Sequence, residues 1–199
     1  MQRGSEIRQQ LGLPTGPLIG VFSRLAPWKG QHVVLQALAQ LPGVSCIVAG
    51  DALFGEQPYA AHLARLVDEL GLAGRVQFLG QRSDVPRLMR AVDAVIHPSI
   101  DPEPFGRTLV EAMLAGVPVI ATDAGAASDI LEAGRAGTLV PPGDADALAR
   151  AVKLVLSHPA GQRGQLDYAI ARARSHYSMA RMLQSISGVI GAHAAGQAA

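Results

Sequence analysis

The most informative stretch of the chain joins a short apolar run to a helical pattern and reads HPSIDPEPFGRTLVEAM, from His97 to Met113. Residues 94–97 are largely apolar, as in a strand that is buried on both faces. The loop that follows has a proline on each side of Glu103, and the prolines favour extended backbone there. Gly106 then opens a helical pattern. The stretch therefore predicts a strand, a loop and a helix in that order.

The same order recurs along most of the chain. Further short apolar runs lie at 18–22, 44–49, 76–79, 117–121 and 138–140. Helical patterns lie between and after them, at 31–40, 58–70, 85–90, 106–115, 127–131 and 144–156. This alternation predicts an α/β fold with a doubly wound, parallel, six-stranded sheet of the Rossmann-like type. Ligands bind such sheets at the carboxyl ends of the strands, so each strand-to-helix junction is a candidate site.

Three parts are predicted along the chain. Residues 1–160 carry the alternating pattern and are enough for one Rossmann-like domain with a full core. Residues 161–190 read only as helix and predict a C-terminal helical extension. Residues 191–199 are rich in alanine and glycine and predict a disordered tail.

Composition and charge exclude several classes of protein. The formal net charge of the 199 residues is +1, which lacks the dense basic face of a nucleic-acid-binding protein. No run approaches the roughly 18 apolar residues of a transmembrane segment. The N-terminus also lacks a signal-peptide layout, so a cytoplasmic location is predicted. The single Cys46 lies in an apolar run and reads as a buried structural thiol.

Metal and dinucleotide sites are not predicted. The six histidines have no metal-ligand spacing, and no CxxC motif occurs. No GxGxxG follows a strand, which argues against a dehydrogenase, and the P-loop motif GxxxxGK[ST] is absent. Asp144 and Asp146 form an Asp-x-Asp pair, which binds a divalent cation in some sugar-transferring enzymes. Asp144 lies where a helix N-cap is expected, however, and capping is the preferred interpretation.

The loop after the first strand holds two cations, Arg24 and Lys29, five residues apart. An arginine can grip a phosphate bidentately and a lysine adds a point charge, so the pair suits a diphosphate. Lys29 and Gly30 come directly before a helix, whose N-terminus also favours negative charge. A solvated basic loop without a ligand is the alternative interpretation.

Two other junctions offer backbone groups to a ligand. Gly50 follows the second strand, where it permits a tight turn or the close approach of a ligand. After the third strand, the backbone of Gln81 and Arg82 is available to hydrogen-bond the edge of a base. Ser83 or Asp84 is expected to cap the helix that follows.

The junction that contains Glu103 combines an anion site with two carboxylates. Gly106 opens the helix, so the first free N–H groups belong to residues 107–109 and can hold a phosphate beside the Arg107 side chain. Glu111 lies about one turn into the helix, and its carboxylate can accept two hydroxyl hydrogen bonds, as a ribose offers. Glu103 projects from the loop towards sugar hydroxyls. The alternative is that both glutamates only favour the helix dipole.

Glu103 and Glu111 fit the E-x7-E motif of retaining glycosyltransferases with the two-domain GT-B fold. The run EPFGRTLVEAMLAGVPVIAT, which begins at Glu103, closely resembles members of family four. Three further segments resemble that family: its phosphate loop at residues 24–25 and 29–30, and its base-side strand at residues 76–80. The resemblance covers residues 11–155, with its motifs in order on the expected junctions.

The resemblance implies an enzyme that transfers a hexose from a UDP-, GDP- or ADP-sugar with retention, and that needs no metal or other cofactor. Arg24 and Lys29 would neutralise the donor diphosphate and the charge of the leaving group, so they are the predicted catalytic residues together with Glu103. Glu103 would bind hydroxyls of the transferred sugar, and Glu111 would hold the ribose. The other predicted substrate-binding residues are Gly50, Arg82, Phe105, Gly106, Arg107, Thr108 and Leu109.

Two features depart from the family. Ser23 stands where glycine is more common before the arginine. The family's N-terminal domain, which supplies acceptor binding and further catalytic groups, has no room before the first strand. The chain is therefore expected to be the donor-binding half of a larger enzyme, inactive without that domain. Its apolar surplus and the helices after Gly161 are expected to pack on the missing half, and the full-length enzyme could associate with a membrane surface.

Two alternatives stay open on the sequence. A non-catalytic nucleotide or nucleotide-sugar binding module, acting by interaction, would use the same cleft. A sugar-nucleotide epimerase with the GT-B fold would also start from it. The nucleotide, the sugar and the acceptor are not determined by these motifs, because backbone contacts read the base and a single glutamate suits several hexoses.

Overall fold

A computed structural model describes residues 4–184, 186 and 187 of the chain. The sheet strands are β1 (Leu18–Phe22), β2 (Ser45–Ala49), β3 (Val76–Gly80), β4 (Ala94–His97), β5 (Val119–Thr122) and β6 (Thr138–Val140). All pairs are parallel and the order is β3-β2-β1-β4-β5-β6, which confirms the predicted doubly wound sheet. The order reverses between β1 and β4, so a ligand crevice is expected at the carboxyl ends of these two strands.

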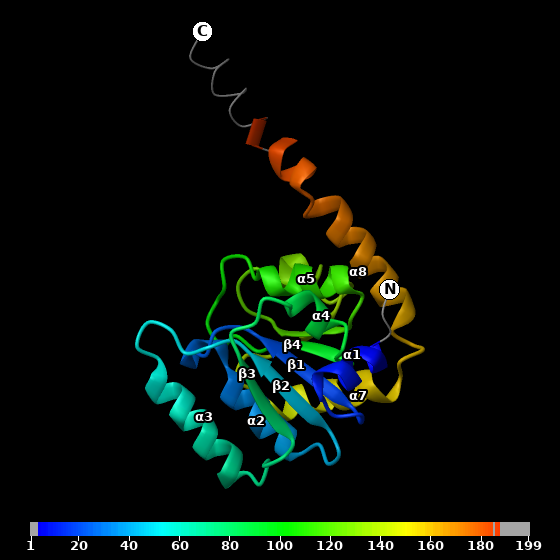
Figure 1. Cartoon of the computed structure of the whole chain (residues 1–199). Coiled ribbons are helices and arrows are strands. Elements are labelled where there is room, and N and C mark those ends of the chain that lie inside the picture. The colour runs from blue at the N-terminus through cyan, green and yellow to red at the C-terminus, as the bar shows by residue number, and fades with distance from the viewer. Residues whose placement is uncertain (1–3, 185, 188–199) are drawn as a thin grey trace.

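Helices cover both faces of the sheet (Figure 1). They are α1 (Gly4–Leu11), α2 (Gln31–Ala39), α3 (Gln57–Glu69), α4 (Val85–Met89), α5 (Arg107–Ala115), α6 (Ala127–Ile130), α7 (Ala145–Ser157) and α8 (Arg163–His176), with a 3-10 turn, η1 (Pro27–Lys29), before α2. On one face α2 packs against α3 and α7. On the other face α5 packs against α4, α6 and α8.

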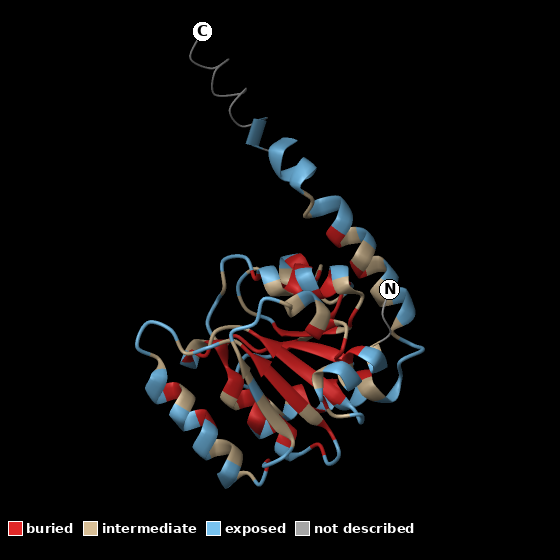
Figure 2. Ribbon diagram, in the orientation of Figure 1, coloured by how far each residue is buried: buried red, intermediate tan, exposed pale blue. Residues whose placement is uncertain are grey.

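Each face of the sheet has its own hydrophobic cluster. In β1, Leu18 and Phe22 pack on the α5 side, whereas Ile19 and Val21 pack on the α2 side. The central strands are therefore buried on both faces, as Figure 2 shows, and this explains their continuous apolar runs. Cys46 is fully buried in the α2-side cluster, which confirms the structural thiol, and burial raises its pKa to about 12.

The two ends of the described chain add to the sequence expectation. The pattern did not predict α1, whose Ile7 is buried in the α5-side cluster. The predicted helical segment 161–190 begins with α8, and its Ala169 and Ala173 are buried in the same cluster. Residues 179–184 are also helical and project away from the sheet (Figure 1). The predicted tail at 191–199 lies outside the described residues. Over the described part of the chain, no helix is both long and apolar enough to cross a bilayer.

Candidate functional site

A surface hollow lies at the carboxyl edge of the sheet, beside the reversal of strand order. It has a volume of about 290 Å³, and Glu111 of α5 contributes to its wall. Two predicted backbone segments also line it, Gly50 after β2 and Gln81-Arg82 after β3. The structure thus brings together Glu111, predicted to hold the ribose, Gln81 and Arg82, predicted to meet the base, and Gly50, predicted to allow a tight turn or the close approach of a ligand. The remaining lining residues are Phe22, Ser23, Ala49, Val85 and Pro86.

A cluster of charged side chains forms around Glu103. One carboxylate oxygen, Oε1, lies 2.7 Å from Nζ of Lys29, and the other, Oε2, lies 2.8 Å from Nε2 of His97. Ser99 donates its hydroxyl to Oε2 at 3.1 Å. Lys29 and His97 are buried, with 7% and 4% of their surface exposed, and the Glu103 side chain keeps 19%. Such burial requires partners, and the cluster supplies them.

The carboxyl of Glu103 is strongly acidic in this setting. Burial by itself raises the pKa of the carboxyl, but hydrogen bonds from His97 and Lys29, with the charge on both groups, outweigh it. The net effect lowers the pKa from 4.5 to about 2. Glu103 is therefore an ionised acceptor over the whole physiological pH range, which suits a carboxylate that binds hydroxyl groups.

Backbone contacts from the next junction hold the Glu103 loop. The N–H of Ala126 donates to the Glu103 carbonyl at 3.0 Å. Gly125 has a φ of +59°, and a Cβ on it would collide with the backbone N and O of Glu103. Thr122, the last residue of β5, donates its hydroxyl to the carbonyl of Ser99. The end of β5 and the loop after it thus hold the loop after β4 in place.

Both cations of the predicted phosphate loop lie close to one aromatic ring. The Arg24 guanidinium is 5.3 Å from the ring centre of Trp28, and Lys29 Nζ is 4.2 Å from the same centre. Arg24 also lies 5.4 Å from the ring of Phe54, which is 86% exposed on the loop after β2. These are cation–π distances. Arg24 and Lys29 therefore both lie against the Trp28 ring, close to the end of β1.

Gly30 and Gln31 set the position of this loop. Gly30 has a φ of +70°, and a Cβ there would strike the carbonyl of Pro98, so the turn before α2 packs directly on the loop after β4. The buried Gln31 side chain donates to Ser23 Oγ and to the Arg24 carbonyl, both at 2.9 Å. Close backbone packing at Gly30 explains how Lys29 reaches Glu103.

The N-terminus of α5 faces the same region. Gly106 is its N-cap, in the left-handed conformation with a φ of +73°. Thr108 donates its hydroxyl to the Phe22 carbonyl at 3.1 Å, which ties α5 to the end of β1. The Leu109 N–H already donates to the Gly106 carbonyl at 3.0 Å, whereas Arg107 and Thr108 come earlier in the first turn. The Arg107 side chain is exposed.

Gly50 and Asp84 each have a local structural role. The sequence left the role of Gly50 open between a tight turn and a ligand contact, and it predicted Asp84 as a possible helix cap. The backbone that closely approaches Gly50 is the carbonyl of Ser23, where a Cβ would collide. Asp84 is at the N-cap of α4, but its side chain caps no N–H; it accepts two hydrogen bonds from Arg82, at 2.9 and 3.0 Å. The side-chain cap expected for Asp84 is therefore wrong, because the Arg82 guanidinium occupies its carboxylate.

The expected cap at Asp144 is confirmed, since its carboxylate accepts the N–H of Ala147 at 2.8 Å. Within the described residues, no group of three or more His, Cys, Asp or Glu side chains could hold a metal ion.

Sequence reasoning missed four side chains of the site. His97 was read only as the end of a strand, and Ser99, Trp28 and Phe54 were given no role. His97 carried one usable signal, because a histidine at the end of an otherwise apolar buried strand needs a partner. The contacts of Phe54 with Arg24 arise between loops of different strands and left no local signal.

The fold and the site define a Rossmann-like α/β domain with two cations and a carboxylate at its carboxyl edge. The family model described as "Glycosyl transferases group 1" matches residues 4–175. The chain belongs to this family and has the fold of the C-terminal domain of GT-B glycosyltransferases.

Named relatives agree with this assignment. The chain is 40% identical over 164 residues to D-inositol 3-phosphate glycosyltransferase of Mycobacterium marinum, which covers 81% of this chain and 35% of that protein. The crystal structure of Anabaena HepE in complex with UDP-glucose is 44% identical, with a TM-score of 0.91, over 95% of this chain and 52% of that one. The crystal structure of the C-terminal domain of the Francisella tularensis group 1 glycosyl transferase LpcC is 25% identical, with a TM-score of 0.80, over 90% and 95% of the chains. The chain thus spans about a third to a half of the longer relatives.

Proposed function

We propose that this chain is the donor-binding domain of a retaining, metal-independent glycosyltransferase that transfers a hexose from a nucleotide-diphosphate sugar. One observation carries the proposal: the hollow lined by Glu111 and the cluster of Lys29, His97 and Glu103 lie at the same edge of the sheet, with the N-terminus of α5 between them in sequence. A nucleotide sugar has the matching order of base and ribose, diphosphate, and sugar.

The nucleoside would occupy the hollow. Glu111 is exposed on its wall and can accept both ribose hydroxyls. The backbone of Gln81 and Arg82 would meet the edge of the base. UDP is the first nucleotide to test, because Anabaena HepE, at 44% identity, was crystallised with UDP and with UDP-glucose.

The diphosphate would be held by charge and helix geometry without a metal. Arg24 and Lys29 supply two cations beside Trp28, and the first turn of α5 supplies backbone N–H groups at Arg107 and Thr108. Negative charge grows on the diphosphate as the bond to the sugar breaks. Fixed positive groups therefore stabilise the transition state more than the ground state, which is the requirement for catalysis.

The hexose would lie over Glu103, whose ionised carboxylate accepts hydroxyl hydrogen bonds, with the N–H groups of Phe105 and Gly106 beside it. Glu103 and Lys29 are paired before the donor binds. In the complex, Lys29 would bind a diphosphate oxygen and Glu103 would accept a hydrogen bond from a sugar hydroxyl. The pair therefore already places both side chains where the diphosphate joins the sugar.

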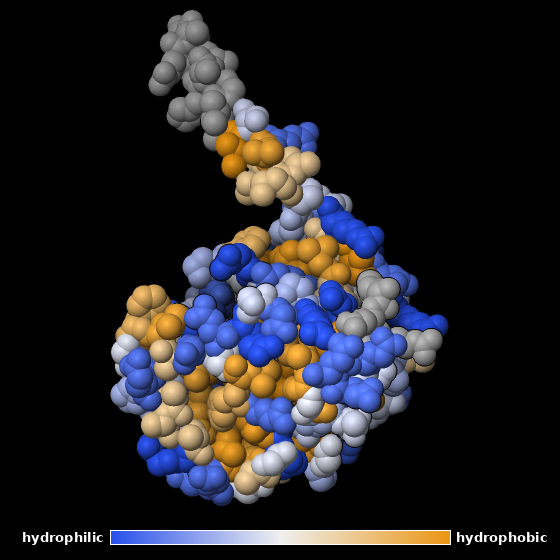
Figure 3. All heavy atoms as spheres, in the orientation of Figure 1, coloured by the Kyte–Doolittle hydropathy of each residue, from blue (hydrophilic) through white to orange (hydrophobic). Residues whose placement is uncertain are grey.

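Transfer itself would need a second domain that brings the acceptor. Beyond α8, Met179, Met182, Leu183 and Ile186 are between 48% and 68% exposed (Figure 3). An apolar row of this kind fits a surface that packs on that domain.

The test is calorimetric titration of the purified chain with UDP, GDP, ADP and their hexose conjugates, without metal and then with magnesium. Lys29→Ala and Glu111→Ala are each expected to weaken binding of one nucleotide at least tenfold, with no effect of magnesium. Lys153→Ala and Glu69→Ala, which change exposed residues on α7 and α3, are the matched controls. Failure of every nucleotide to bind, or equal loss in the controls, would refute the proposal and favour a module that acts by interaction.

A further inference from the structure

The ring of Phe105, in the loop that follows Glu103, contacts the residue that ends α8. Phe105 and Tyr177 meet edge to face, with ring centres 5.9 Å apart and planes at 75°. Phe105 is still 46% exposed. Together with residues 176–179, 181 and 182 it lines a hollow of about 350 Å³. The contact therefore joins the C-terminal helix to the loop that carries the candidate sugar site.

Tyr177 is held firmly on its own side. It is the C-cap of α8, and its N–H donates to the carbonyl of Ala173, which is buried. The Tyr177 ring also packs against the α5-side hydrophobic cluster. A ring anchored in this way can restrain Phe105, because the edge-to-face arrangement fixes the direction of both rings.

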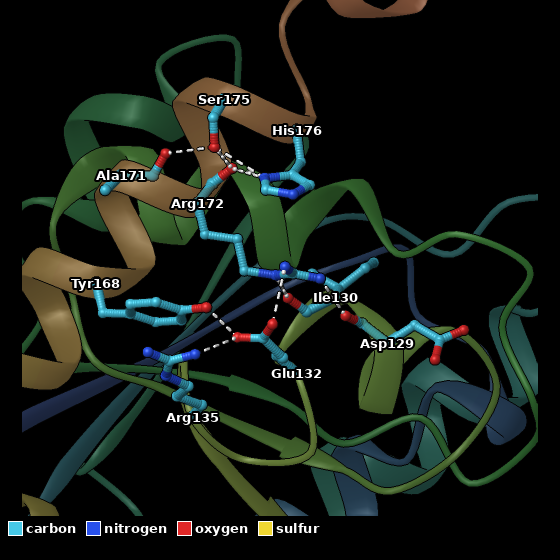
Figure 4. Close-up of polar contacts among 9 residues, drawn as sticks. All are labelled: Asp129, Ile130, Glu132, Arg135, Tyr168, Ala171, Arg172, Ser175 and His176. Carbon is cyan, nitrogen blue, oxygen red and sulfur yellow. Dashed lines mark hydrogen bonds and ion pairs between the residues drawn. The ribbon is translucent and has the colours of Figure 1, made fainter. Parts of the chain in front are cut away.

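Long polar side chains attach α8 to α6 and to the loop between α6 and β6. Arg172 donates to the carbonyls of Asp129 and Ile130, at 2.8 and 3.0 Å, as Figure 4 shows. Gln165 donates to the carbonyls of Gly134 and Gly137, both at 3.0 Å. The Asp129 carbonyl also accepts the N–H of Glu132, and the added bonds from Arg172 and Gln165 fix the axial position of α8.

A second set of contacts involves Glu132, which has a positive φ of 49° in the same loop. Tyr168 donates its hydroxyl to Glu132, and the Arg135 guanidinium lies 4.0 Å from the centre of the Tyr168 ring (Figure 4). Arg172 also approaches Glu132, at 3.5 Å. The contacts of Gln165, Tyr168 and Arg172 thus fix the position of the end of α8, and therefore the position of Tyr177.

Glu103 and Phe105 are restrained by different parts of the molecule. Glu103 is fixed by Lys29, His97 and Ser99 and by the backbone of Ala126. None of these contacts reaches Phe105, whose ring meets Tyr177 instead. The N–H groups of Phe105 and Gly106 therefore depend on the ring contact more than the Glu103 carboxylate does.

We propose that Tyr177 is a positioning residue for the donor sugar: through the Phe105 ring it holds the N–H groups of Phe105 and Gly106 in place to bind the hexose. The inference rests on the proposed function, since it needs a nucleotide sugar in this cleft. It assigns the C-terminal helix a role in recognising the sugar part of the donor and none in binding the nucleotide.

The experiment compares UDP and UDP-glucose as ligands of the wild-type chain and of Tyr177→Ala, by calorimetry. Loss of the ring should weaken UDP-glucose about tenfold and leave UDP within about twofold, because the hollow at Glu111 and the phosphate loop are untouched. Tyr177→Phe keeps the edge-to-face ring and should bind both ligands as the wild type does. Met179→Ala, which removes a 68% exposed apolar side chain next to the hollow, is the matched control.

The outcomes separate this inference from the proposed function. A wild-type chain that binds neither ligand refutes the proposed function. Binding of both ligands by the wild type, with the same ratio of affinities in Tyr177→Ala, refutes the positioning role alone. Equal weakening of UDP and UDP-glucose would mean that Tyr177 only stabilises the fold, and it would overturn the inference as well. Arg172→Met is a second variant in case Tyr177→Ala misfolds. It removes hydrogen bonds that hold α8 without changing Tyr177 itself, and it should lower the affinity for UDP-glucose and not that for UDP.

Discussion

The Glu103 carboxylate should make the stability of the domain depend on pH in a defined way. Its pKa in the folded chain is lowered from 4.5 to about 2 by His97 and Lys29, against the opposing effect of burial. A group whose pKa is depressed by folding stabilises the folded state above its unfolded pKa. That contribution is lost as the pH falls towards the folded value. The Glu103→Gln variant keeps the shape of the side chain and lacks the charge, so it lacks this pH dependence.

The magnitude follows from the shift. A pKa difference of this size contributes about 3 kcal/mol to the free energy of unfolding at neutral pH, since one pKa unit corresponds to about 1.4 kcal/mol. Because the folded pKa is about 2, only part of this is lost by pH 3, and we expect about 2 kcal/mol to disappear between pH 6 and pH 3. The stability gap between the wild type and Glu103→Gln should narrow by that amount over the same range.

The assay is urea unfolding of both proteins at half-unit pH steps between about pH 6 and pH 3, with free energies from linear extrapolation. Glu69→Gln removes a carboxylate from the exposed surface of α3 and controls for the change in net charge. A gap between wild type and Glu103→Gln that stays constant with pH would refute the coupling of Glu103 to Lys29 and His97. A gap that widens as the pH falls would show that the sign of the shift is wrong.

Three further results are expected. Gly125→Ala should lower the free energy of unfolding in urea by about 3 kcal/mol, because the residue has a positive φ and its Cβ would collide with the Glu103 backbone. Gly143→Ala, at a φ of +75° with open space around it, should lower it by about 1 kcal/mol. Equal losses in the two variants would exclude the close contact at Gly125. Asp144→Ala should lower stability by about 1 kcal/mol through the lost helix cap, and manganese should not raise the melting temperature of the wild type; a metal-dependent rise would favour a cation site. Cys46 should react with a thiol reagent only as fast as the chain opens, because the thiol is buried and its pKa is raised to about 12; rapid labelling in native buffer would contradict this.

The sequence predicted most of the fold because its signals are local. Short apolar runs bounded by glycine, proline or aspartate mark the strands, and all six are found in the sheet, where the four inner strands are almost entirely buried and the edge strands β3 and β6 only partly. Parallel strands joined by helices then fix which edge carries the ligand. The predicted positions of Gly50, Arg82 and Glu111 around one hollow followed from this topology alone.

Local pattern failed where side chains compete for partners. Asp84 looks like a helix cap, yet Arg82, two residues away, takes its carboxylate. The pattern also missed α1, whose mean character is polar and which is held by the buried Ile7 and by Arg8, whose side chain pairs with Asp93 and donates to the Gly16 carbonyl. In both cases the local sequence allows two conformations, and contacts with neighbouring side chains decide between them.

The sequence by itself determined the sheet, the edge that such a sheet offers to ligands, and the segments that reach that edge, because the period of apolar residues and the chemistry of the junctions are properties of neighbouring residues. Only the tertiary structure decided that Lys29 and His97 share Glu103, that Arg24 lies against Phe54, and that Phe105 meets Tyr177. Lys29 comes from the turn after β1, Phe54 from the loop after β2 and Tyr177 from the end of a terminal helix, whereas His97 and Glu103 lie at the end of β4 and in the loop that follows it. Their distances depend on strand order, on register and on the close backbone contacts at Gly30 and Gly125, which no local pattern specifies.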